Sequence, residues 1–401
     1  MIERPYYIDR LWRLNGVQLA KVLTGMRRSG KSGILRLLEQ RLYKEGVEPD
    51  ALIRINLELA DSAPLREPST LLDHIRSQKS ETGTTYVLID EAQESQGIGN
   101  VVRTLMEDGC YDVFLTGSHT KLVERELADV MSGRYVEVPV YPLSFSEYYN
   151  AHTSTGKTVD DRRLFQQYLS NGGLPHTLVL EDDPYALHDY LDGVYHTIIR
   201  RDVATGLGHE DPLLLDAIVQ ELFACLGTPS SANGLSRTLS SSGRSCSDDT
   251  IARYLGALTN AYAFHGMKRY DLKSGVVLKT QEKFYADDLG LRTLLVGPHQ
   301  TSLSGLLENV VYLELRRRFG TVFAGKHYSR SIGFVVGDAQ NREYYQVVPS
   351  VLDPATLQST LASLLAERDN YPKTILTLDE VGLLSHQGIR QRNLIEWLLA
   401  A

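Results

Sequence analysis

The sequence predicts an α/β fold in which a parallel sheet comes first, a helical region follows, and a smaller α/β region comes last. Three observations lead to this prediction. Strand-like and helix-like segments alternate over residues 18–140, residues 160–226 show helical spacing alone, and strand-like segments return from residue 264. Strands separated by single helices indicate a parallel sheet, because each return to a parallel position requires a crossover connection.

The first region supplies the clearest alternation. Its apolar, strand-like segments are 18–24, 51–57, 86–90, 113–117 and 135–140. Helical spacing begins at residue 34 and returns near 69–80, 98–107 and 121–131. Successive strands are thus separated by single helices, as a parallel sheet requires.

The composition is that of an ordinary globular protein, with 42% hydrophobic and 23% charged residues in a chain of 401. No apolar run reaches the length of a membrane span, and the first residues lack the apolar stretch of a signal peptide. The three cysteines are widely spaced and form no metal or disulfide pattern. We therefore expect a cytoplasmic protein without a membrane partner. The net charge of −8 means that any DNA contact must come from a local basic patch.

Residues 25–32 read Gly-Met-Arg-Arg-Ser-Gly-Lys-Ser and match the phosphate-binding pattern G-x-x-x-x-G-K-[ST]. The two glycines allow successive backbone N–H groups to point at phosphate oxygens. Lys31 is expected to reach the β- and γ-phosphates, and the Ser32 hydroxyl to bind Mg²⁺. The residues expected to contact the nucleotide are Gly25, Met26, Arg27, Arg28, Ser29, Gly30, Lys31, Ser32 and Gly33. Arg27 and Arg28 are alternatively partner contacts or solvated side chains, and for Arg27 the solvated position is favoured.

Two acids follow an apolar strand at Asp90 and Glu91. Asp90 is placed to hold the metal beside Ser32, and Glu91 to polarise an attacking water molecule. An Asp-Glu pair is common on protein surfaces, but a pair that directly follows an apolar strand and has a phosphate loop upstream favours the nucleotide site.

Ser118 and Arg134 are weaker candidates. Ser118 follows the strand 113–117 and is a candidate to sense the γ-phosphate or orient the water; the alternative is a cap for the next helix, a position that serine favours, and the two roles are compatible. Arg134 lies at a turn between a helix and a strand. It is either an arginine finger that reaches a neighbouring subunit or a surface residue that the helix dipole stabilises.

The rest of the chain is expected to be helical and then mixed. Helical spacing is found at 164–169, 185–202 and 213–226, and a Ser-rich stretch at 227–247 is interpreted as loops between short helices. An amphipathic helix at 250–258 and strands at 264–270 and 276–284 together favour a winged helix. The last part is expected to hold helices at 306–318 and 354–369, and strands at 321–324, 332–336, 344–348 and 374–378, and the helix at 354–369 and the strand at 374–378 are expected to close it.

These motifs together resemble one large prokaryotic group of ATPases. The segments that carry the resemblance are Leu-Thr-Gly-Met-Arg-Arg-Ser-Gly-Lys-Ser, Leu-Ile-Asp-Glu-Ala-Gln, Leu-Thr-Gly-Ser and Met-Ser-Gly-Arg-Tyr, and others continue over nearly the whole chain. The sequence is similar to AAA+-type P-loop ATPases joined to a C-terminal domain of unknown function with a restriction-endonuclease-like, PD-(D/E)xK, core.

The resemblance implies an ASCE-type parallel sheet, a helical lid, a winged helix and a small endonuclease-like domain. The corresponding domains are an ATPase domain at 1–150, a lid at 151–210, a winged-helix-like domain at 211–295 and a degenerate endonuclease-like domain at 296–401. It implies ATP and Mg²⁺ as cofactors, and it assigns Lys31, Ser32, Asp90 and Glu91 to the nucleotide site. Ser118 resembles the sensor residue, and Arg134 the finger.

The last domain departs from an active nuclease. Glu308 fits the first helical acid, but Gly333 stands where the metal-binding aspartate is usual, and the strand 344–348 carries no lysine at the expected place. We therefore expect Mg²⁺-dependent ATP hydrolysis that drives a switch or a DNA-associated motor, with possible DNA contact through the last two domains and possible self-association. The alternatives are a nucleotide-dependent scaffold or sensor with little turnover and, less favoured, a nuclease-linked ATPase.

Overall fold

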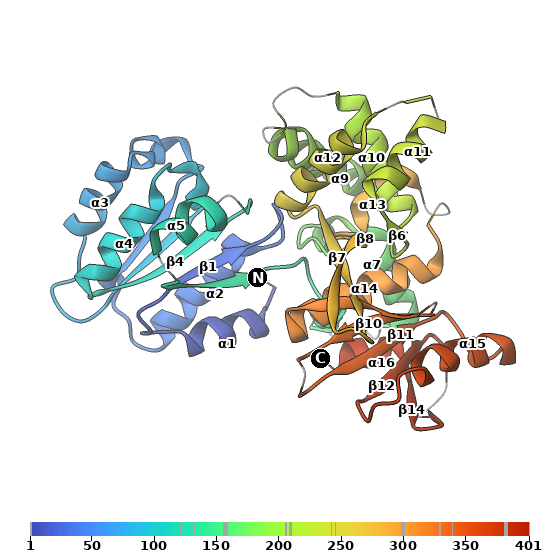
Figure 1. The fold of residues 1–401 in the computed structure, drawn as a ribbon. Coiled ribbons are helices and arrows are strands. Elements are labelled where there is room, and N and C mark those ends of the chain that lie inside the picture. Colours follow the sequence, from blue (N-terminus) through green and yellow to red (C-terminus); the bar gives the residue numbers. More distant parts are fainter. Residues whose placement is uncertain are drawn as a thin grey trace. The chain divides into compact units, whose positions relative to one another are not determined.

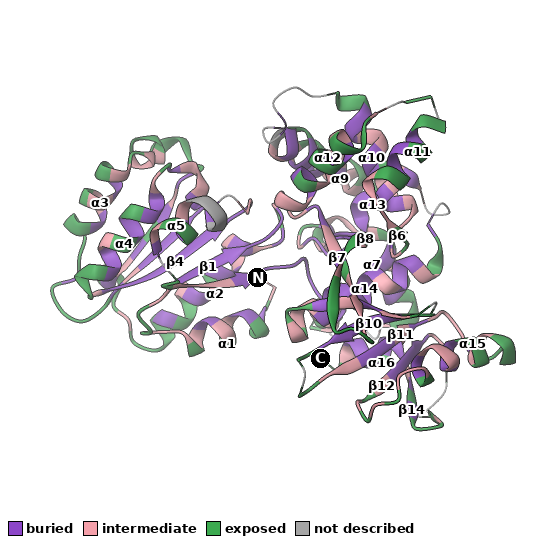
Figure 2. Cartoon of the chain, in the orientation of Figure 1, coloured by how far each residue is buried: buried purple, intermediate pink, exposed green. Residues whose placement is uncertain are grey.

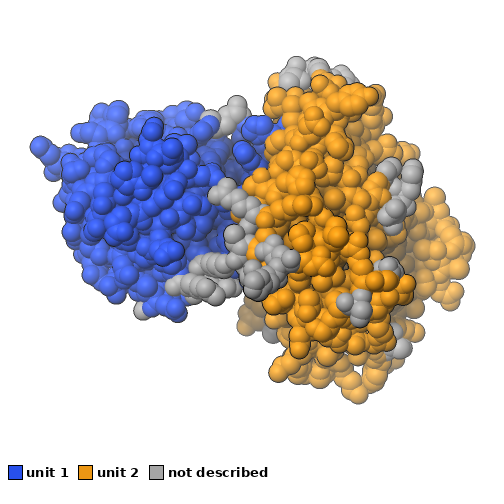
Figure 3. All heavy atoms as spheres, turned by 90° about the horizontal axis from the view of Figure 1, so that it is seen from above, with its two compact units in different colours: residues 1–142, 174–176, 260–262 blue, residues 143–173, 177–259, 263–401 orange. Residues whose placement is uncertain are grey.

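The computed structural model describes residues 2–400 apart from 121, 132, 155–158, 205–206, 208–210, 242, 245, 298–300, 329, 339 and 381–383. The chain forms two compact units (Figure 3). The first comprises residues 1–142, 174–176 and 260–262, and the second comprises residues 143–173, 177–259 and 263–401. Within the described residues, no helix is both long enough and apolar enough to cross a membrane.

The first unit is built on the parallel sheet that the sequence predicts. Its five strands lie in the order β2-β3-β4-β1-β5, and every neighbouring pair is parallel (Figure 1). The strands are β1 (Ala20–Thr24), β2 (Leu52–Asn56), β3 (Thr85–Asp90), β4 (Tyr111–Gly117) and β5 (Tyr135–Pro139). Strand β4 therefore separates β1, which precedes the phosphate loop, from β3, which ends in the two acids.

Helices cover both faces of this sheet because side chains along each strand alternate between two cores. Val22 packs with α3 and α4 on one face, whereas Leu23 packs with α1 and α2 on the other. These helices are α1 (Pro5–Arg13), α2 (Lys31–Lys44), α3 (Pro68–Ser77) and α4 (Ile98–Asp108). Short 3₁₀ turns lie at η1 (Pro49–Ala51), η2 (Ala60–Arg66) and η3 (Ala92–Glu94).

The helix expected at 121–131 is present but irregular. It consists of a π-helical segment, η4 (Leu122–Leu127), followed by α5 (Ala128–Met131), and its expected first residue lies outside the described residues. Leu122, Leu127 and Met131 are buried in the same core as α3 and α4. The amphipathic pattern thus predicts the buried face correctly, although the hydrogen-bond pattern is not α-helical throughout.

The second unit begins with helices, as expected. They are α6 (Phe145–Thr153), α7 (Asp161–Asn171), α8 (Thr177–Leu180), α9 (Pro184–Tyr195) with the π-helical η5 (His196–Val203), and α10 (Pro212–Ala224). Helix α6 starts at a capping box, in which the Ser144 hydroxyl accepts from the Glu147 N–H and the Glu147 carboxylate accepts from the Ser144 N–H.

A helix-rich segment with one hairpin comes next in the second unit. It contains β6 (Pro229–Ser230), α11 (Ala232–Ser241), α12 (Asp248–Asn260), β7 (Phe264–Asp271), β8 (Val276–Ala286) and α13 (Gly290–Val296). The Ser-rich stretch therefore holds a helix of 10 residues, α11, whose Leu235 and Leu239 are buried one turn apart. Strand β8 pairs antiparallel with both β7 and β6.

The end of the chain adds the rest of a mixed sheet. Its elements are α14 (Leu303–Phe319), β9 (Val322–His327), β10 (Arg330–Val336), β11 (Glu343–Val347), α15 (Pro354–Leu365), β12 (Lys373–Thr377), β13 (Leu384–His386), β14 (Ile389–Asn393) and α16 (Leu394–Leu399). The sheet has nine strands in the order β13-β14-β12-β11-β10-β9-β7-β8-β6, and Figure 2 shows exposed residues, in green, along the hairpin of β7 and β8. Strands β9, β10 and β11 form an antiparallel meander, and β12 is parallel to β11.

The expectation that a strand near 374–378 closes the chain is wrong. Strands β13 and β14 and helix α16 follow it. The strand Ile389–Asn393 carries Arg390 and Arg392 between its inward-facing residues, and those include the polar Gln391 and Asn393. A strand whose buried face is itself polar has no apolar alternation that sequence reading could detect.

Candidate nucleotide site

The loop between β1 and α2 needs glycine at both of its ends. Gly25 has a φ of 145°, and a Cβ there would lie 2.1 Å from the carbonyl oxygen of Val140. Gly30 has a φ of 103°, and a Cβ there would lie 3.2 Å from Nη1 of Arg4. Any side chain at Gly25 would displace the backbone, so the loop conformation depends on that glycine.

The start of α2 offers its backbone donors to a ligand. This helix has no side-chain cap at its N-terminus, so its first N–H groups are not satisfied by a neighbouring side chain. Beside it, the buried Ser29 hydroxyl has no hydrogen-bond partner among the described residues. Unsatisfied donors at a helix N-terminus fit phosphate oxygens, and the loop therefore fits the nucleotide that its sequence predicts.

Lys31 lies with its ammonium group inside the loop. The Lys31 side chain is buried, and its Nζ donates to the carbonyl oxygens of Gly25 and Met26, each over 2.9 Å. Met26 is fully buried, whereas Ser32 and Gly33 are half-buried in the first turn of α2. Lys31 is therefore held where a phosphate chain cradled by the loop amides would lie.

An N-terminal arginine supports this loop from outside the motif. Arg4 is only 4% exposed, and it donates to the carbonyl oxygens of Ser29 over 3.1 Å and of Tyr141 over 2.9 Å. The guanidinium group lies 4.6 Å from the ring centre of Tyr7. Sequence reasoning missed Arg4, because a single arginine just before the first helix carries no pattern.

The two acids lie at the end of β3, and Thr116 of β4 holds both. The Thr116 hydroxyl donates to Asp90 Oδ1 over 2.6 Å and accepts from the backbone N–H of Glu91 over 2.8 Å. Asp90 is 1% exposed and Thr116 is fully buried. The stretch Leu-Thr-Gly-Ser contained the signal for Thr116, but the sequence alone directed attention to Ser118.

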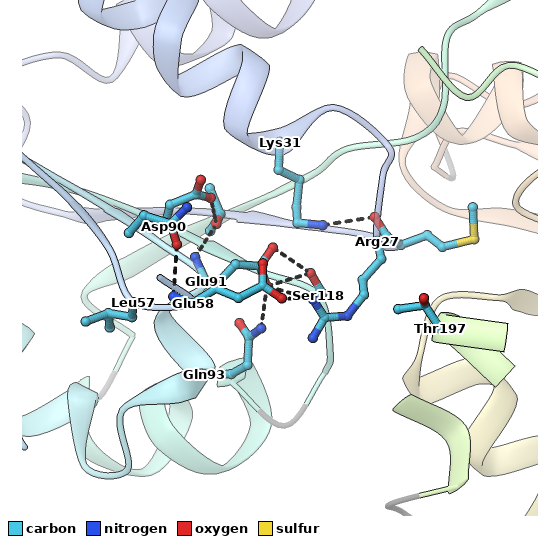
Figure 4. Close-up of polar contacts among 12 residues, drawn as sticks. Arg27, Lys31, Leu57, Glu58, Asp90, Glu91, Gln93, Ser118 and Thr197 are labelled. Carbon is cyan, nitrogen blue, oxygen red and sulfur yellow. Dashed lines mark hydrogen bonds and ion pairs between the residues drawn. The ribbon is translucent and has the colours of Figure 1, made fainter. Parts of the chain in front are cut away.

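Glu91 faces a set of donors from three segments (Figure 4). The Ser118 hydroxyl donates to both carboxylate oxygens, over 3.1 and 2.9 Å. The Gln93 side-chain amide donates to Oε2. Glu91 also has a left-handed backbone, with a φ of 53°. Such a backbone is uncommon for a side chain of this size and marks a position fixed by its surroundings.

Electrostatics keep Glu91 ionised. Burial by itself would raise the pKa of this carboxyl group, but the nearby positive charge of Lys31 acts against it. Hydrogen bonds from Gln93 and Ser118 and the charge of Arg27 act in the same direction as Lys31. The net result is a pKa below the ordinary value, so Glu91 accepts but does not donate hydrogen bonds at neutral pH.

Arg27 is not the solvated side chain that the sequence favoured. Its side chain is 11% exposed, and Nη1 lies 3.0 Å from Glu58 Oε1 and 3.9 Å from Glu91 Oε2. The carboxylates that attract it lie after β2 and β3, which a reading of the loop alone cannot reveal. Arg28, in contrast, is exposed and has a left-handed backbone with a φ of 67°.

The expected metal ligands fit an ion that is held mainly by phosphate and water. Asp90 supplies a buried carboxylate and Ser32 a hydroxyl at the start of α2. The described residues contain no group of three or more His, Cys, Asp or Glu side chains that could hold a metal ion. Mg²⁺ commonly binds one or two protein groups together with nucleotide phosphates, and Asp90 and Ser32 fit such a pair of protein ligands.

Arg134 does not join this group. It directly precedes β5, and its carbonyl oxygen accepts from the N–H of Ala20, the first residue of β1. The parallel strands begin at that edge of the sheet, whereas the phosphate loop and the acids lie where they end. The Arg134 side chain is 44% exposed and lies 3.6 Å from Glu107. Arg134 therefore cannot act on the site of its own chain.

The last region of the chain has no nuclease acid at the expected place. The N–H of Gly333 donates to the Gln346 side-chain oxygen over 2.8 Å, and a Cβ at residue 333 would lie 3.0 Å from the carbonyl oxygen of Tyr345. Glu308, the expected helical acid, accepts from Lys283 Nζ and from the Tyr285 hydroxyl, each over 2.9 Å. Its carboxylate is thus already engaged in a hydrogen-bonded ion pair.

Comparison with known proteins agrees with this geometry. Residues 18–149 match the family described as AAA domain, and residues 162–302 match a domain of unknown function (DUF8612). An uncharacterized protein of Haemophilus influenzae is 32% identical over 100% of this chain and 99% of its own length. An uncharacterized protein of Methanocaldococcus jannaschii, MJ1544, is 26% identical over 82% of this chain and 74% of its own length.

The fold also has a counterpart among solved structures. The Walker-type ATPase PABY2304 of Pyrococcus abyssi superposes with a TM-score of 0.51 at 15% identity, over 74% of this chain and 96% of that chain. At this identity the likeness concerns the fold alone. The chain belongs to the same family as the Haemophilus influenzae protein, and its first unit has the AAA+ type of P-loop NTPase fold.

Proposed function

We propose that this protein binds ATP with Mg²⁺ and hydrolyses it at the carboxyl edge of the five-stranded sheet, and that the cycle drives a conformational switch. The observation that carries this proposal is the meeting of three segments at one place. Lys31 lies where the loop meets α2, Asp90 and Glu91 lie at and just after the end of β3, and Thr116 and Ser118 lie near and just after the end of β4, the strand between β1 and β3.

Each residue has a role that its geometry supports. The loop amides and Lys31 hold the phosphates, and Ser32 and Asp90 hold the metal ion, which neutralises charge on the phosphate oxygens. Glu91, kept ionised by its neighbours, accepts a hydrogen bond from the attacking water molecule and orients it. Ser118, which already contacts Glu91, is placed to transmit the state of the γ-phosphate to that carboxylate.

Replacing Glu91 by Gln tests the enzyme proposal. The amide keeps the size of the side chain but cannot act as a base, so we expect ATP binding to persist while turnover falls by about 10²-fold or more. Glu58→Gln is the control, because Glu58 contacts Arg27 at the same edge but lies two residues after β2 rather than after the acid strand. If Glu91→Gln and the unaltered protein turn over ATP equally slowly, the protein is not an ATPase of this kind.

One observation favours a second candidate, a nucleotide-dependent scaffold or sensor with little turnover. The Glu91 carboxylate already receives hydrogen bonds from Ser118 and Gln93 and lies beside Arg27. Glu91 can act as the base for ATP hydrolysis only if nucleotide binding breaks these contacts. Measuring ATP binding and steady-state turnover on the same sample, with and without duplex DNA, separates the two functions.

Arg134 can contribute only from a neighbouring copy, and we propose that it acts there as an arginine finger. Its exposed side chain and its place at the opposite edge of the sheet support this role. Native mass measurement with ATP present tests it. A strict monomer under those conditions contradicts the finger role, whereas a ring whose turnover falls with Arg134→Ala supports it.

Two further proposals concern the second unit. The order α10-β6-α11-α12-β7-β8, with β8 paired to both other strands, supports a winged helix within the expected domain 211–295. The order α14-β9-β10-β11-α15-β12, with three antiparallel strands and a parallel fourth, supports an endonuclease-like core within 296–401. Helix α12 starts with Asp248 and Asp249, which would repel a DNA backbone.

We do not propose nuclease activity for this core. The engaged Glu308, the glycine at 333 and the Gln346 contact leave it without the carboxylates that a metal-dependent nuclease needs. Incubation of purified protein with supercoiled DNA and Mn²⁺ checks this point. Cutting that persists in a Lys31→Met variant and disappears in Glu308→Ala would show that the core is active.

A further inference from the structure

We propose that the second unit binds single-stranded nucleic acid at a basic, aromatic hollow beside the β7–β8 hairpin. The hollow has a volume of about 380 Å³. It lies between the turn that joins β9 to β10 and the end of α15, and its lining residues are His327, Tyr328, Arg330, Leu365, Ala366 and Arg368. The proposal does not depend on ATP hydrolysis, because no residue of the nucleotide site takes part.

Cations outnumber carboxylates at the hollow, where Arg330, Arg368 and Lys273 lie near Glu367 and Asp271. Arg330 and Arg368 are exposed, and the only hydrogen bond or ion pair of either guanidinium group among the described residues is from Arg330 Nη1, which donates to the carbonyl oxygen of Ala362. Two nearby carboxylates are already engaged. Glu367 contacts His327 Nδ1, and Asp271 accepts from the N–H groups of Lys273 and Ser274 over 3.1 and 2.9 Å.

The hairpin brings further positive charge to the same place. Strand β7 runs parallel to β9, with Asp271 opposite Lys326, and the N–H of Leu272 donates to the carbonyl oxygen of Lys326 over 2.9 Å. The turn that follows β7 therefore lies beside the turn that follows β9. Lys273 from the first turn places its Nζ 4.7 Å from the ring centre of Tyr328 in the second.

Tyr328 is the residue that selects the kind of ligand. Its side chain is 62% exposed even though the Lys273 ammonium group and the His327 ring, whose centre lies 4.8 Å away, contact it, and its φ of 52° is uncommon for an aromatic residue. Leu365, also exposed, adds an apolar surface to the same hollow. An aromatic ring beside guanidinium groups offers stacking for a base and charge for its phosphates.

This combination favours single strands over duplexes. The bases of a duplex are stacked inside it, so a duplex backbone would use the arginines but leave the ring and the hollow without function. A single strand can place an unstacked base against Tyr328 while Arg330, Arg368 and Lys273 contact phosphates. A local patch of this kind is compatible with a net charge of −8, because the rest of the surface does not need to bind.

Fluorescence anisotropy with the full chain tests the proposal, using labelled oligothymidylate of about ten nucleotides in the absence of ATP. We expect Tyr328→Ala to weaken binding about tenfold, and Tyr328→Phe, which keeps the stacking ring, to bind as the unaltered protein does. Removing two phosphate contacts in Arg330→Ala/Arg368→Ala should make the negative slope of log K against log salt concentration shallower by about 1.4.

Lys79→Ala/Arg103→Ala is the matched control, because it removes two exposed cations from the first unit and changes the net charge equally. Equal binding by the Arg330→Ala/Arg368→Ala variant and this control would overturn the proposal. The proposal would also be overturned if duplex DNA or polyglutamate competed as well as the single strand does, because the surface would then recognise negative charge alone. An oligouridylate that competes as well as oligothymidylate supports it and extends it to RNA. Lys31→Met should bind the oligonucleotide normally even if ATP turnover is lost.

Discussion

A lysine and a carboxylate are buried both at the edge of the five-stranded sheet where the strands begin and at the edge where they end, but the contacts of these groups differ. At the edge where the strands begin, Lys21 Nζ donates to Asp112 Oδ1 over 2.5 Å and to the Val17 carbonyl over 2.7 Å. Asp112 Oδ2 accepts from the N–H of Gly16 over 2.8 Å. At the edge where the strands end, Lys31 lies against loop carbonyls, and α2 starts without a side-chain cap.

This difference separates a structural charge cluster from a binding one. Burial of charge is common to both edges, so burial alone does not identify a site. What distinguishes the second edge is unsatisfied hydrogen-bonding capacity, namely the uncapped helix and the Ser29 hydroxyl without a partner among the described residues. Matched substitutions at the two edges should therefore affect different properties.

Lys31→Met should give the largest effect on function. Removing the ammonium group removes charge stabilisation of the phosphates, so we expect ATP turnover to fall by about 10²-fold or more, with weaker binding of a fluorescent ATP analogue. The free energy of unfolding of the first unit should change by only about 1 kcal/mol, because two loop carbonyls lose a donor while Glu91 keeps its contacts with Ser118, Gln93 and Arg27 after the charge of Lys31 is removed. A large loss of stability with normal turnover would contradict the comparison.

Lys21→Met should show the opposite behaviour. It leaves Asp112 as a buried carboxylate without its ion-pair partner, which costs about 3 kcal/mol or more. Turnover per folded molecule should stay near that of the unaltered protein. Urea unfolding followed by Trp12 fluorescence measures this, in a Trp397→Phe background that removes the signal of the second of the two tryptophans. Lys21→Met/Asp112→Leu is the control and should recover most of the lost stability.

The sequence predicted the first unit well because its signals are local. Strand β1, the loop and α2 are continuous in the chain, and Asp90 and Glu91 directly follow their strand. It missed Arg4 and Thr116 because their contacts join residues 25 or more positions apart. The position of Arg27 was predicted wrongly for the same reason, since its carboxylate partners Glu58 and Glu91 lie after two other strands, β2 and β3.

For the second unit, the sequence predicted helices and strands but not how the strands pair in the sheet. Strands β7 and β9 were both expected from their apolar patterns, but nothing in either pattern indicates that they pair in parallel. Likewise, the contact between Gly333 and Gln346 depends on the register of β10 and β11. Composition and periodicity specify which residues face a core, whereas partner strands are chosen by the whole fold.

A matched pair of threonines sharpens the comparison at a smaller scale. Thr116→Val removes the hydroxyl that joins Asp90 to the Glu91 N–H, so we expect a loss of about 1–3 kcal/mol and a fall in turnover of about tenfold or more as the acids shift. Thr85→Val, at the opposite edge, removes a hydroxyl that accepts from the Ser80 N–H. It should cost similar stability and leave turnover per folded molecule unchanged, and equal losses of turnover would contradict a positioning role for Thr116.

The smallest expected effect is a difference in pH dependence between the two buried acids. Burial raises the pKa of Asp112 despite the Lys21 contact, whereas Lys31 and the other donors outweigh burial and lower the pKa of Glu91. A lowered pKa stabilises the fold above the unfolded-state pKa, which is about 4.3 for Glu, and that stabilisation is lost as the pH falls through the folded-state pKa. A raised folded-state pKa destabilises the fold instead. This destabilisation grows as the pH rises above the unfolded-state pKa, which is about 3.9 for Asp.

Urea unfolding of the unaltered protein, Glu91→Gln and Asp112→Asn between about pH 3.5 and pH 6 measures both slopes. As the pH rises, the stability of the unaltered protein should increase relative to Glu91→Gln and decrease relative to Asp112→Asn. Each change should be about 1.4 kcal/mol for a tenfold difference between the acid dissociation constants of the folded and unfolded states. The constant loss that Asp112→Asn causes by leaving Lys21 without its carboxylate does not affect the slope. Slopes of the same sign would mean that the pKa values of both carboxyl groups are shifted in the same direction, and the distinction between a structural and a binding cluster would then rest only on the uncapped helix and the Ser29 hydroxyl.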